Sequence, residues 1–144
     1  KAKNLVKILE DENINKIFHF ARFDVAVLKH FLKADVKNIY CTKIASKIAR
    51  TYTDKHGLKD LVKEIIGVDM SKQMQSSDWG AEKLSEKQLK YAATDCIFLH
   101  QLKKELNKML IRENRMELLN KCLKFLNTRV DLDLADYKID IFSH

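Results

Sequence analysis

A short apolar segment followed at once by an amphipathic helix occurs twice between residues 16 and 52, and this order constrains the fold most. Residues 16–20 (KIFHF) and 38–42 (NIYCT) are rich in aromatic and β-branched side chains, which predicts two buried strands. Residues 22–32 and 43–52 carry apolar side chains at three-to-four spacing, which predicts helices. Strands that alternate with helices favour parallel pairing through crossover helices, so an α/β fold is expected.

The remaining segments are predicted to be helices separated by a polar loop at residues 70–80. The absence of proline and the presence of only 3 glycines support a helix-rich chain. Ser85 and Gln88 have the spacing of a capping box, and Gly67 is expected to end a helix. The predicted helices cover 4–10 with Asn4 as cap, 58–66, 85–114 and 116–126.

The length of 144 residues predicts a single domain, residues 1–144, with one core. No apolar run is long enough to span a bilayer, so a cytoplasmic protein without membrane contact is expected. Cys41, Cys96 and Cys122 are widely spaced among apolar or helix-forming neighbours, and this favours buried free thiols over metal ligands.

The formal charge of +7 is concentrated upstream of Arg112. Residues 1–111 hold 21 basic and 14 acidic side chains, whereas residues 112–144 hold six of each. A basic surface favours a polyanionic partner, of which nucleic acid is the commonest, although many basic proteins are merely soluble.

Three residues are candidates for chemistry. Tyr91 and Asp95 lie four apart in a predicted helix and therefore share one face, where a carboxylate and a phenol can hold a metal and orient its water. Asp24 follows the end of a predicted parallel strand, where α/β sheets usually bind ligands. Each has a simpler explanation, because Tyr and Asp often share a helix face and an acid in a first turn stabilises the helix dipole.

The surrounding sequence resembles ribonuclease D-like proteins of the DEDD exonuclease superfamily. HFARFDVAVL (19–28) resembles the second exonuclease motif, and YAATD (91–95) resembles the third motif in its tyrosine variant. CTKIA (41–45), GLKDL (57–61), and SDWG (77–80) followed by LSEKQL (84–89) resemble the connecting segments in the same order. The likeness covers residues 4–110 and is greatest to the short alphaproteobacterial nano-RNase C branch.

The resemblance implies a ribonuclease H-like fold and 3′→5′ exoribonuclease activity on short RNA. In this family four acidic residues bind two divalent cations, Mg²⁺ or Mn²⁺, for phosphodiester hydrolysis. Asp24 and Asp95 would be two of the four carboxylates, and Tyr91 would position the attacking water. Ring-shaped homo-oligomers are also implied, with the apolar and acidic tail, residues 127–144, as a possible contact. Apolar and acidic residues alternate too regularly in the tail for it to extend the preceding helix. A tail that folds back on its own domain is expected equally with one that contacts another subunit.

One departure from the family pattern is important. The first exonuclease motif, an Asp-x-Glu on an upstream strand, does not precede Asp24. An incomplete fold is therefore expected, with about two parallel strands retained, the N-terminal strands missing and about half of the metal site present. The alternatives are an exonuclease fold that binds nucleic acid without cleaving it and a small helical interaction module.

Several other residues are candidates for substrate binding. His19 could contact substrate or be a satisfied core histidine, and Trp79 could stack on a base or pack in a loop. Lys43, Lys47 and Arg50 share one predicted helix face, which could follow a phosphate backbone or simply be solvated. The full set of predicted substrate contacts is His19, Phe23, Lys43, Lys47, Arg50 and Trp79.

Overall fold

The two predicted strands form a parallel pair. In this pair β1 (Lys16–Phe18) lies beside β2 (Ile39–Cys41), with Lys16 opposite Ile39 and Phe18 opposite Cys41. Each strand is shorter than predicted, and a helix follows each one, α2 (Ala21–Leu32) after β1 and α3 (Thr42–Ala49) after β2. The strand–helix–strand–helix order and the α/β class with two parallel strands are therefore confirmed.

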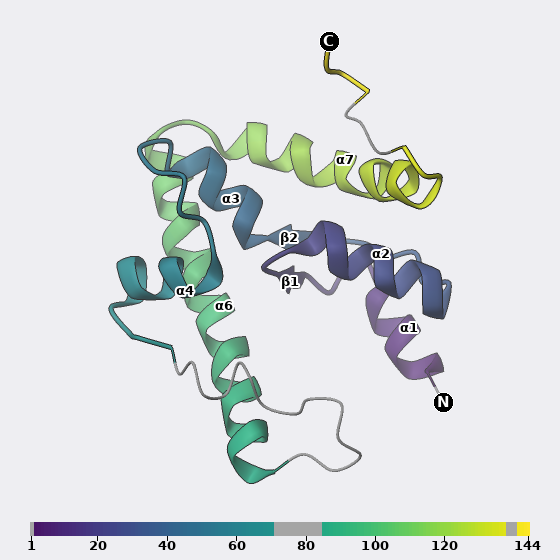
Figure 1. Ribbon diagram of the computed structural model, residues 1–144, viewed down its shortest axis with the longest axis horizontal. Helices are drawn as coiled ribbons and strands as arrows, with labels where there is room; N and C mark the ends of the chain where they lie inside the picture. Colours follow the sequence, from purple (N-terminus) through teal and green to yellow (C-terminus); the bar gives the residue numbers. More distant parts are fainter. Residues whose placement is uncertain (1, 71–84, 138–140) are drawn as a thin grey trace.

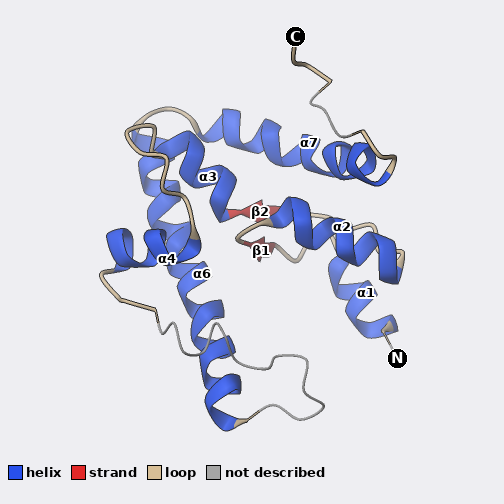
Figure 2. Ribbon diagram, viewed as in Figure 1, coloured by secondary structure: helices blue, strands red, loops and turns tan. Residues whose placement is uncertain are grey.

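Helices make up most of the rest of the chain, as Figure 2 shows. The structure is a computed structural model that describes residues 2–70, 85–137 and 141–144, with the side chains of residues 87 and 90–94 outside the description. Within these residues, no helix has the length and apolar character needed to cross a membrane. The other elements are α1 (Lys3–Leu9), α4 (Leu58–Leu61), the π-helix η1 (Val62–Ile66), α6 (Glu86–Arg112) and α7 (Met116–Leu134).

Local signals predicted the ends of two helices. Ser85 caps α6 with a complete capping box. The backbone N–H of Gln88 donates to Ser85 Oγ, and the backbone N–H of Ser85 donates to Gln88 Oε1. Gly67 ends η1 at φ 83°, a left-handed conformation that glycine adopts without steric cost. The Asn4 cap is wrong, because α1 begins at Lys3 and has no side-chain cap.

Buried side chains form two adjoining clusters. One gathers Leu61, Leu102, Leu106 and Leu119 between α3, α4, α6, η1 and the first half of α7. The other packs α1, α2 and the strands against the second half of α7, and Ile44 and Leu123 belong to both clusters. In Figure 1, α7 accordingly runs across α3 and α2, while the N-terminal half of α6 extends away from the strands.

The last helix is longer than predicted. α7 continues through Leu134, so the predicted helix end at residue 126, and the prediction that the tail does not extend this helix, are wrong for residues 127–134. Two acidic residues in this extension face α2: Asp133 accepts two hydrogen bonds from Arg22, both at 2.7 Å, and Asp131 pairs with Lys29. Packing against α2 therefore extends a helix whose sequence alternation favoured a different structure.

Two of the three predicted buried thiols are exposed. Cys41 is buried at the end of β2, whereas Cys96 on α6 and Cys122 on α7 are exposed, and all three are free. Residue type and apolar or helix-forming neighbours predicted burial, but Cys96 and Cys122 face away from both clusters. The free thiols themselves agree with the prediction.

The Arg22–Asp133 pair makes a pH-dependent contribution to stability. Hydrogen bonds from Arg22 hold the pKa of Asp133 below its usual value. The stabilisation is therefore complete above about pH 4, near the ordinary Asp value, and is lost as the pH falls through the lower folded pKa. We expect Asp133→Asn to lower the unfolding free energy by about 1 kcal/mol at pH 7. Denaturant unfolding of both proteins from pH 7 down to pH 2 should show the difference disappearing, and a constant difference would contradict this origin.

Candidate active site

Asp24 lies in the first turn of α2, just beyond the C-terminal end of β1. Its backbone amide donates to the Phe20 carbonyl at 3.2 Å, which fixes the start of the helix. The side chain lines a cavity of about 360 Å³ with Phe18, Phe23 and Val27 among its walls. Burial in this apolar setting raises the pKa of Asp24. A nearby cation would offset the cost of the desolvated charge.

Asp95 lies on α6 and has an unusual environment. Its Oδ1 is buried and has no hydrogen-bond partner among the described residues. Burial also raises the pKa of this carboxyl. Buried polar atoms are nearly always hydrogen-bonded, so a bare carboxylate oxygen calls for an explanation. A position that accepts a cation is one such explanation.

The third predicted catalytic residue shares the helix with Asp95. Tyr91 is four residues earlier on α6, so its backbone position places it on the same face. Its side chain lies outside the description, and Trp79 falls in the segment 71–84, which is also outside the described residues. The convergence of Asp24, Tyr91 and Asp95 on one cleft therefore remains a prediction.

The donor atoms of these two carboxylates fit a hard divalent cation. Mg²⁺ and Mn²⁺ prefer oxygen ligands, and both carboxylates are desolvated. Among residues 2–70, 85–137 and 141–144, no group of three or more His, Cys, Asp or Glu residues could hold a metal. Asp24 and Asp95 are thus suited to contribute to a metal site but do not form a complete ligand set.

His19 joins the end of β1 to the start of α3. Its Nδ1 lies 2.9 Å from Thr42 Oγ1, and its carbonyl accepts from the Lys43 amide at 3.2 Å. Burial and then the charge of Lys43 lower the pKa of His19 to about 4, so the ring is neutral at pH 7. These contacts support the core-histidine alternative, and substrate contact by His19 remains a prediction.

Arg50 does not share a surface with the two lysines. It follows the end of α3 and is 1% exposed. Its Nη1 donates to Ser46 Oγ and to the Lys55 carbonyl, both at 2.9 Å, and its Nη2 pairs with Glu64. The predicted common face is therefore wrong for Arg50, because the helix ends at Ala49 and the guanidinium links α3 to η1 instead.

The two lysines do lie together. Lys43 and Lys47 are one turn apart on α3 and line the same cavity, and Lys43 Nζ lies 4.5 Å from the centre of the Phe20 ring. Phe23 is 60% exposed beside Asp24 and stacks on Phe20, with ring centres 6.1 Å apart. Sequence analysis did not select Phe20, although an aromatic residue three positions before Phe23 at a helix start was a usable signal.

Known proteins resemble the chain in sequence and structure. The family described as 3′-5′ exonuclease matches residues 1–111. Ribonuclease D of Gluconacetobacter diazotrophicus is 32% identical over 110 residues, which is 76% of this chain and 28% of that relative. DNA polymerase I of Aquifex aeolicus is 34% identical over 117 residues, which is 74% of this chain and 19% of that relative.

The whole length of this chain matches the structure of a solved nuclease. NrnC of Brucella melitensis superposes with a TM-score of 0.90 at 54% identity, covering 100% of this chain and 70% of that chain. NrnC structures with bound Mg²⁺ and bound to pGG match equally well. The chain thus spans 19% to 28% of the two curated relatives and 70% of NrnC. The chain belongs to the 3′-5′ exonuclease family and is ribonuclease D-like.

Proposed function

We propose that this chain carries part of the active site of a 3′→5′ exoribonuclease that hydrolyses short RNA from the 3′ end. The observation that carries the proposal is the similarity over the whole chain to a nuclease solved with Mg²⁺ and with pGG. It is supported by two desolvated carboxylates, Asp24 and Asp95, at the positions that the motifs select. RNA or a short oligonucleotide is the proposed substrate.

Each polar residue has a proposed role. Asp24 and Asp95 are metal ligands, and Tyr91 orients the attacking water. Two divalent cations, when bound, would activate that water and stabilise the leaving 3′ oxygen. Apolar side chains around Asp24 partly desolvate its carboxylate, and this strengthens its attraction to a cation.

Substrate positioning is proposed for a second set of residues. Lys43 and Lys47 carry positive charge on one face of α3, where a phosphate can approach. The exposed Phe23 ring beside Asp24 is suited to stack on a base.

A second candidate is an exonuclease fold that binds nucleic acid without cleaving it. The resemblance requires two more carboxylates in an Asp-x-Glu upstream of Asp24, and this chain has none there. Asp24 and Asp95 alone supply too little negative charge to hold two divalent cations. Activity therefore requires the missing carboxylates to be supplied by residues outside this chain.

The test is cleavage of a 5′-labelled oligoribonucleotide by the full-length gene product that contains this chain. We expect products that shorten stepwise from the 3′ end with Mg²⁺ or Mn²⁺ and no products with EDTA. A deoxyribonucleotide of the same sequence, run in parallel, decides between RNA and DNA. Binding without any cleavage in Mg²⁺ would favour the second candidate.

Self-association remains a prediction. The tail contacts its own domain: Asp131 and Asp133 pair with Lys29 and Arg22 of α2, and the Phe142 ring lies 5.9 Å from the Phe125 ring of α7. These contacts favour the alternative in which residues 127–144 fold back. Light scattering on the full-length protein measures the oligomeric state directly.

A further inference from the structure

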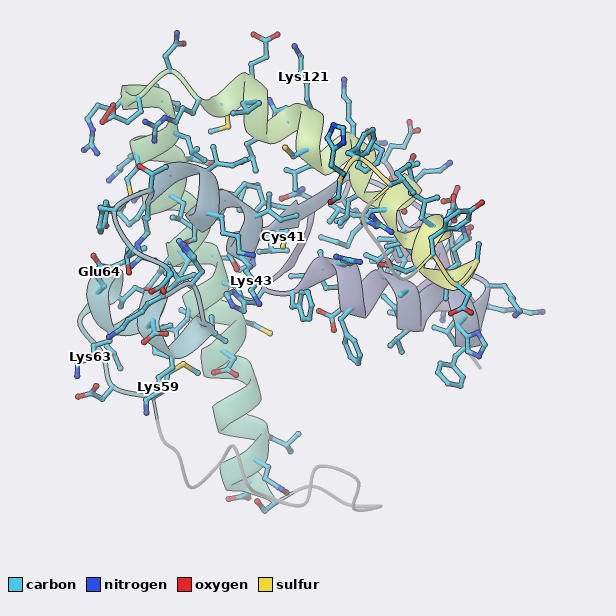
Figure 3. All side chains as sticks on the ribbon, turned by 45° about the horizontal axis from the view of Figure 1, so that its top comes forward. Cys41, Lys43, Lys59, Lys63, Glu64 and Lys121 are labelled. Carbon is cyan, nitrogen blue, oxygen red and sulfur yellow. The ribbon has the colours of Figure 1, made fainter. Side chains whose placement is uncertain are left out.

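A groove between α3 and α7 is not used by the proposed catalytic residues. It has a volume of about 670 Å³. We call it the α3–α7 groove and define it by Lys43 and Lys47 on α3, Lys121, Phe125 and Arg129 on α7, and Phe20 at the start of α2. In Figure 3, Cys41 lies between Lys121 on α7 and Lys43 at the start of α3.

The groove is basic although α7 lies in the neutral part of the sequence. Among the residues that the structure describes, no acidic side chain lines the groove and five cationic ones do, namely Arg22, Lys43, Lys47, Lys121 and Arg129. Of the acids of α7, Asp131 pairs with Lys29. Asp133 pairs with Arg22 and Arg129 at the edge of the groove and offsets one of the five positive charges, which leaves the groove positive. Lys121 lies 3.4 Å from Glu117, but both side chains are highly exposed and such a pair contributes little.

Arg129 has an unused donor in this setting. Its Nη2 lies 3.3 Å from Asp133, whereas its Nε is buried and has no hydrogen-bond partner among the described residues. A buried donor without an acceptor is unfavourable. The Arg129 side chain lines the groove, so an anionic oxygen bound there would pair with its charge.

Aromatic rings are interleaved with the cations. Phe20, Phe125 and Phe142 line the groove and are 46%, 38% and 73% exposed. Alternating cations and exposed rings are typical of surfaces that bind single-stranded nucleic acid, because the bases stack and the phosphates are neutralised. Phe20 also stacks on Phe23, which lines the cavity of Asp24, so this aromatic pair connects the groove to the candidate active site.

We propose that the α3–α7 groove binds the single-stranded RNA segment on the 5′ side of the nucleotide being removed. Lys121 and Arg129 contact the phosphates, and Phe125 stacks on a base. This assignment rests on the proposed function and extends it to α7, which lies beyond the matched residues 1–111. Charge complementarity favours RNA over a second copy of this chain, whose own charge is +7.

The test compares two lysines of α7. Lys121 lines the groove, and the exposed Lys124 does not. Binding of a labelled oligoribonucleotide of about eight nucleotides, within the usual size range of single-strand sites, is followed by fluorescence anisotropy. EDTA is present, so no cleavage occurs. We expect Lys121→Glu to weaken binding about tenfold and Lys124→Glu about twofold, since screening limits charges that do not touch the strand.

Two further measurements identify the kind of contact. In Lys47→Gln/Lys121→Gln, the slope of log affinity against log salt should fall by about 0.7 for each lost phosphate contact. Phe125→Ala should weaken binding about fivefold or more through lost stacking, whereas Thr128→Ala, at an exposed position of α7 that does not line the groove, should not. If Lys121→Glu fails to fold, Lys47→Glu on the opposite wall tests the same groove.

Equal effects of Lys121→Glu and Lys124→Glu, or an unchanged salt slope, would overturn the proposal. A lower molecular mass of Lys121→Glu by light scattering would also overturn it, because the groove would then be an interface between copies. RNA that binds in the groove but is not cut in Mg²⁺ contradicts the proposed function alone. If RNA is cut but Lys121→Glu and Lys124→Glu bind it equally well, only the proposal that the α3–α7 groove binds RNA is contradicted.

Discussion

Replacing Asp95 by Asn is expected to reduce 3′→5′ cleavage by the full-length protein at least about 100-fold, since changing even an outer partner of a metal ligand costs 10- to 100-fold. Asn has nearly the same size as Asp but lacks the charge that attracts a divalent cation. The Asp95 carboxylate is suited to that role because its Oδ1 is buried without a partner among the described residues. The rate at which a labelled oligoribonucleotide shortens in Mg²⁺ measures the effect.

The same substitution should not unfold the protein. Burial raises the pKa of Asp95, so above that pKa its charge opposes folding when no cation is bound. Asp95→Asn should therefore melt at the same or a higher temperature than the unmodified protein at pH 7 in EDTA. Asp54→Asn is the matched control, because Asp54 is exposed in the loop after α3. A folded Asp95→Asn variant with full activity would remove Asp95 from the site.

Replacing Leu119 by Ala is expected to lower the unfolding free energy by about 2 to 5 kcal/mol, the usual range for a buried leucine. Leu119 is 0% exposed in the cluster that joins α3, α6 and α7, so its loss leaves a cavity. Denaturant unfolding followed by circular dichroism gives the difference.

The neighbouring leucine provides the control. Leu118 is 55% exposed on the same helix, so Leu118→Ala makes the same chemical change without a cavity and should shift stability by about 0.5 kcal/mol or less. Equal losses for the two variants would contradict the packing of α7 against α6 and α3.

The sequence predicted those features that depend on neighbouring residues. The capping box at Ser85 and the left-handed Gly67 are satisfied within a few residues, so their local patterns were sufficient. The parallel pairing of β1 with β2 followed from the order of elements, since a crossover helix permits little else. The motifs around Asp24 and Asp95 likewise selected two carboxylates that the fold desolvates, although their joint role in a metal site remains a prediction.

The errors concern residues whose partners lie far away in the chain. The extension of α7 depends on Lys29 and Arg22, about 100 residues away from Asp131 and Asp133. Arg50 was predicted to share one helix face with Lys43 and Lys47 because of its spacing, but it is buried, where Ser46 and Glu64 satisfy its charge.

The sequence by itself determined the α/β class, the parallel strands and the family, because periodicity, capping and motif order are local or sequential properties. Only the tertiary structure decided where α7 ends and which thiols are exposed. It also brought Lys121, Phe125 and Arg129 opposite Lys43 and Lys47 to form one basic groove. The spacing of Lys121, Phe125 and Arg129 along α7 was visible in the sequence. The wall they face was not, because that wall is formed by a helix more than 70 residues earlier, and only the packing of α7 across α3 brings the two together.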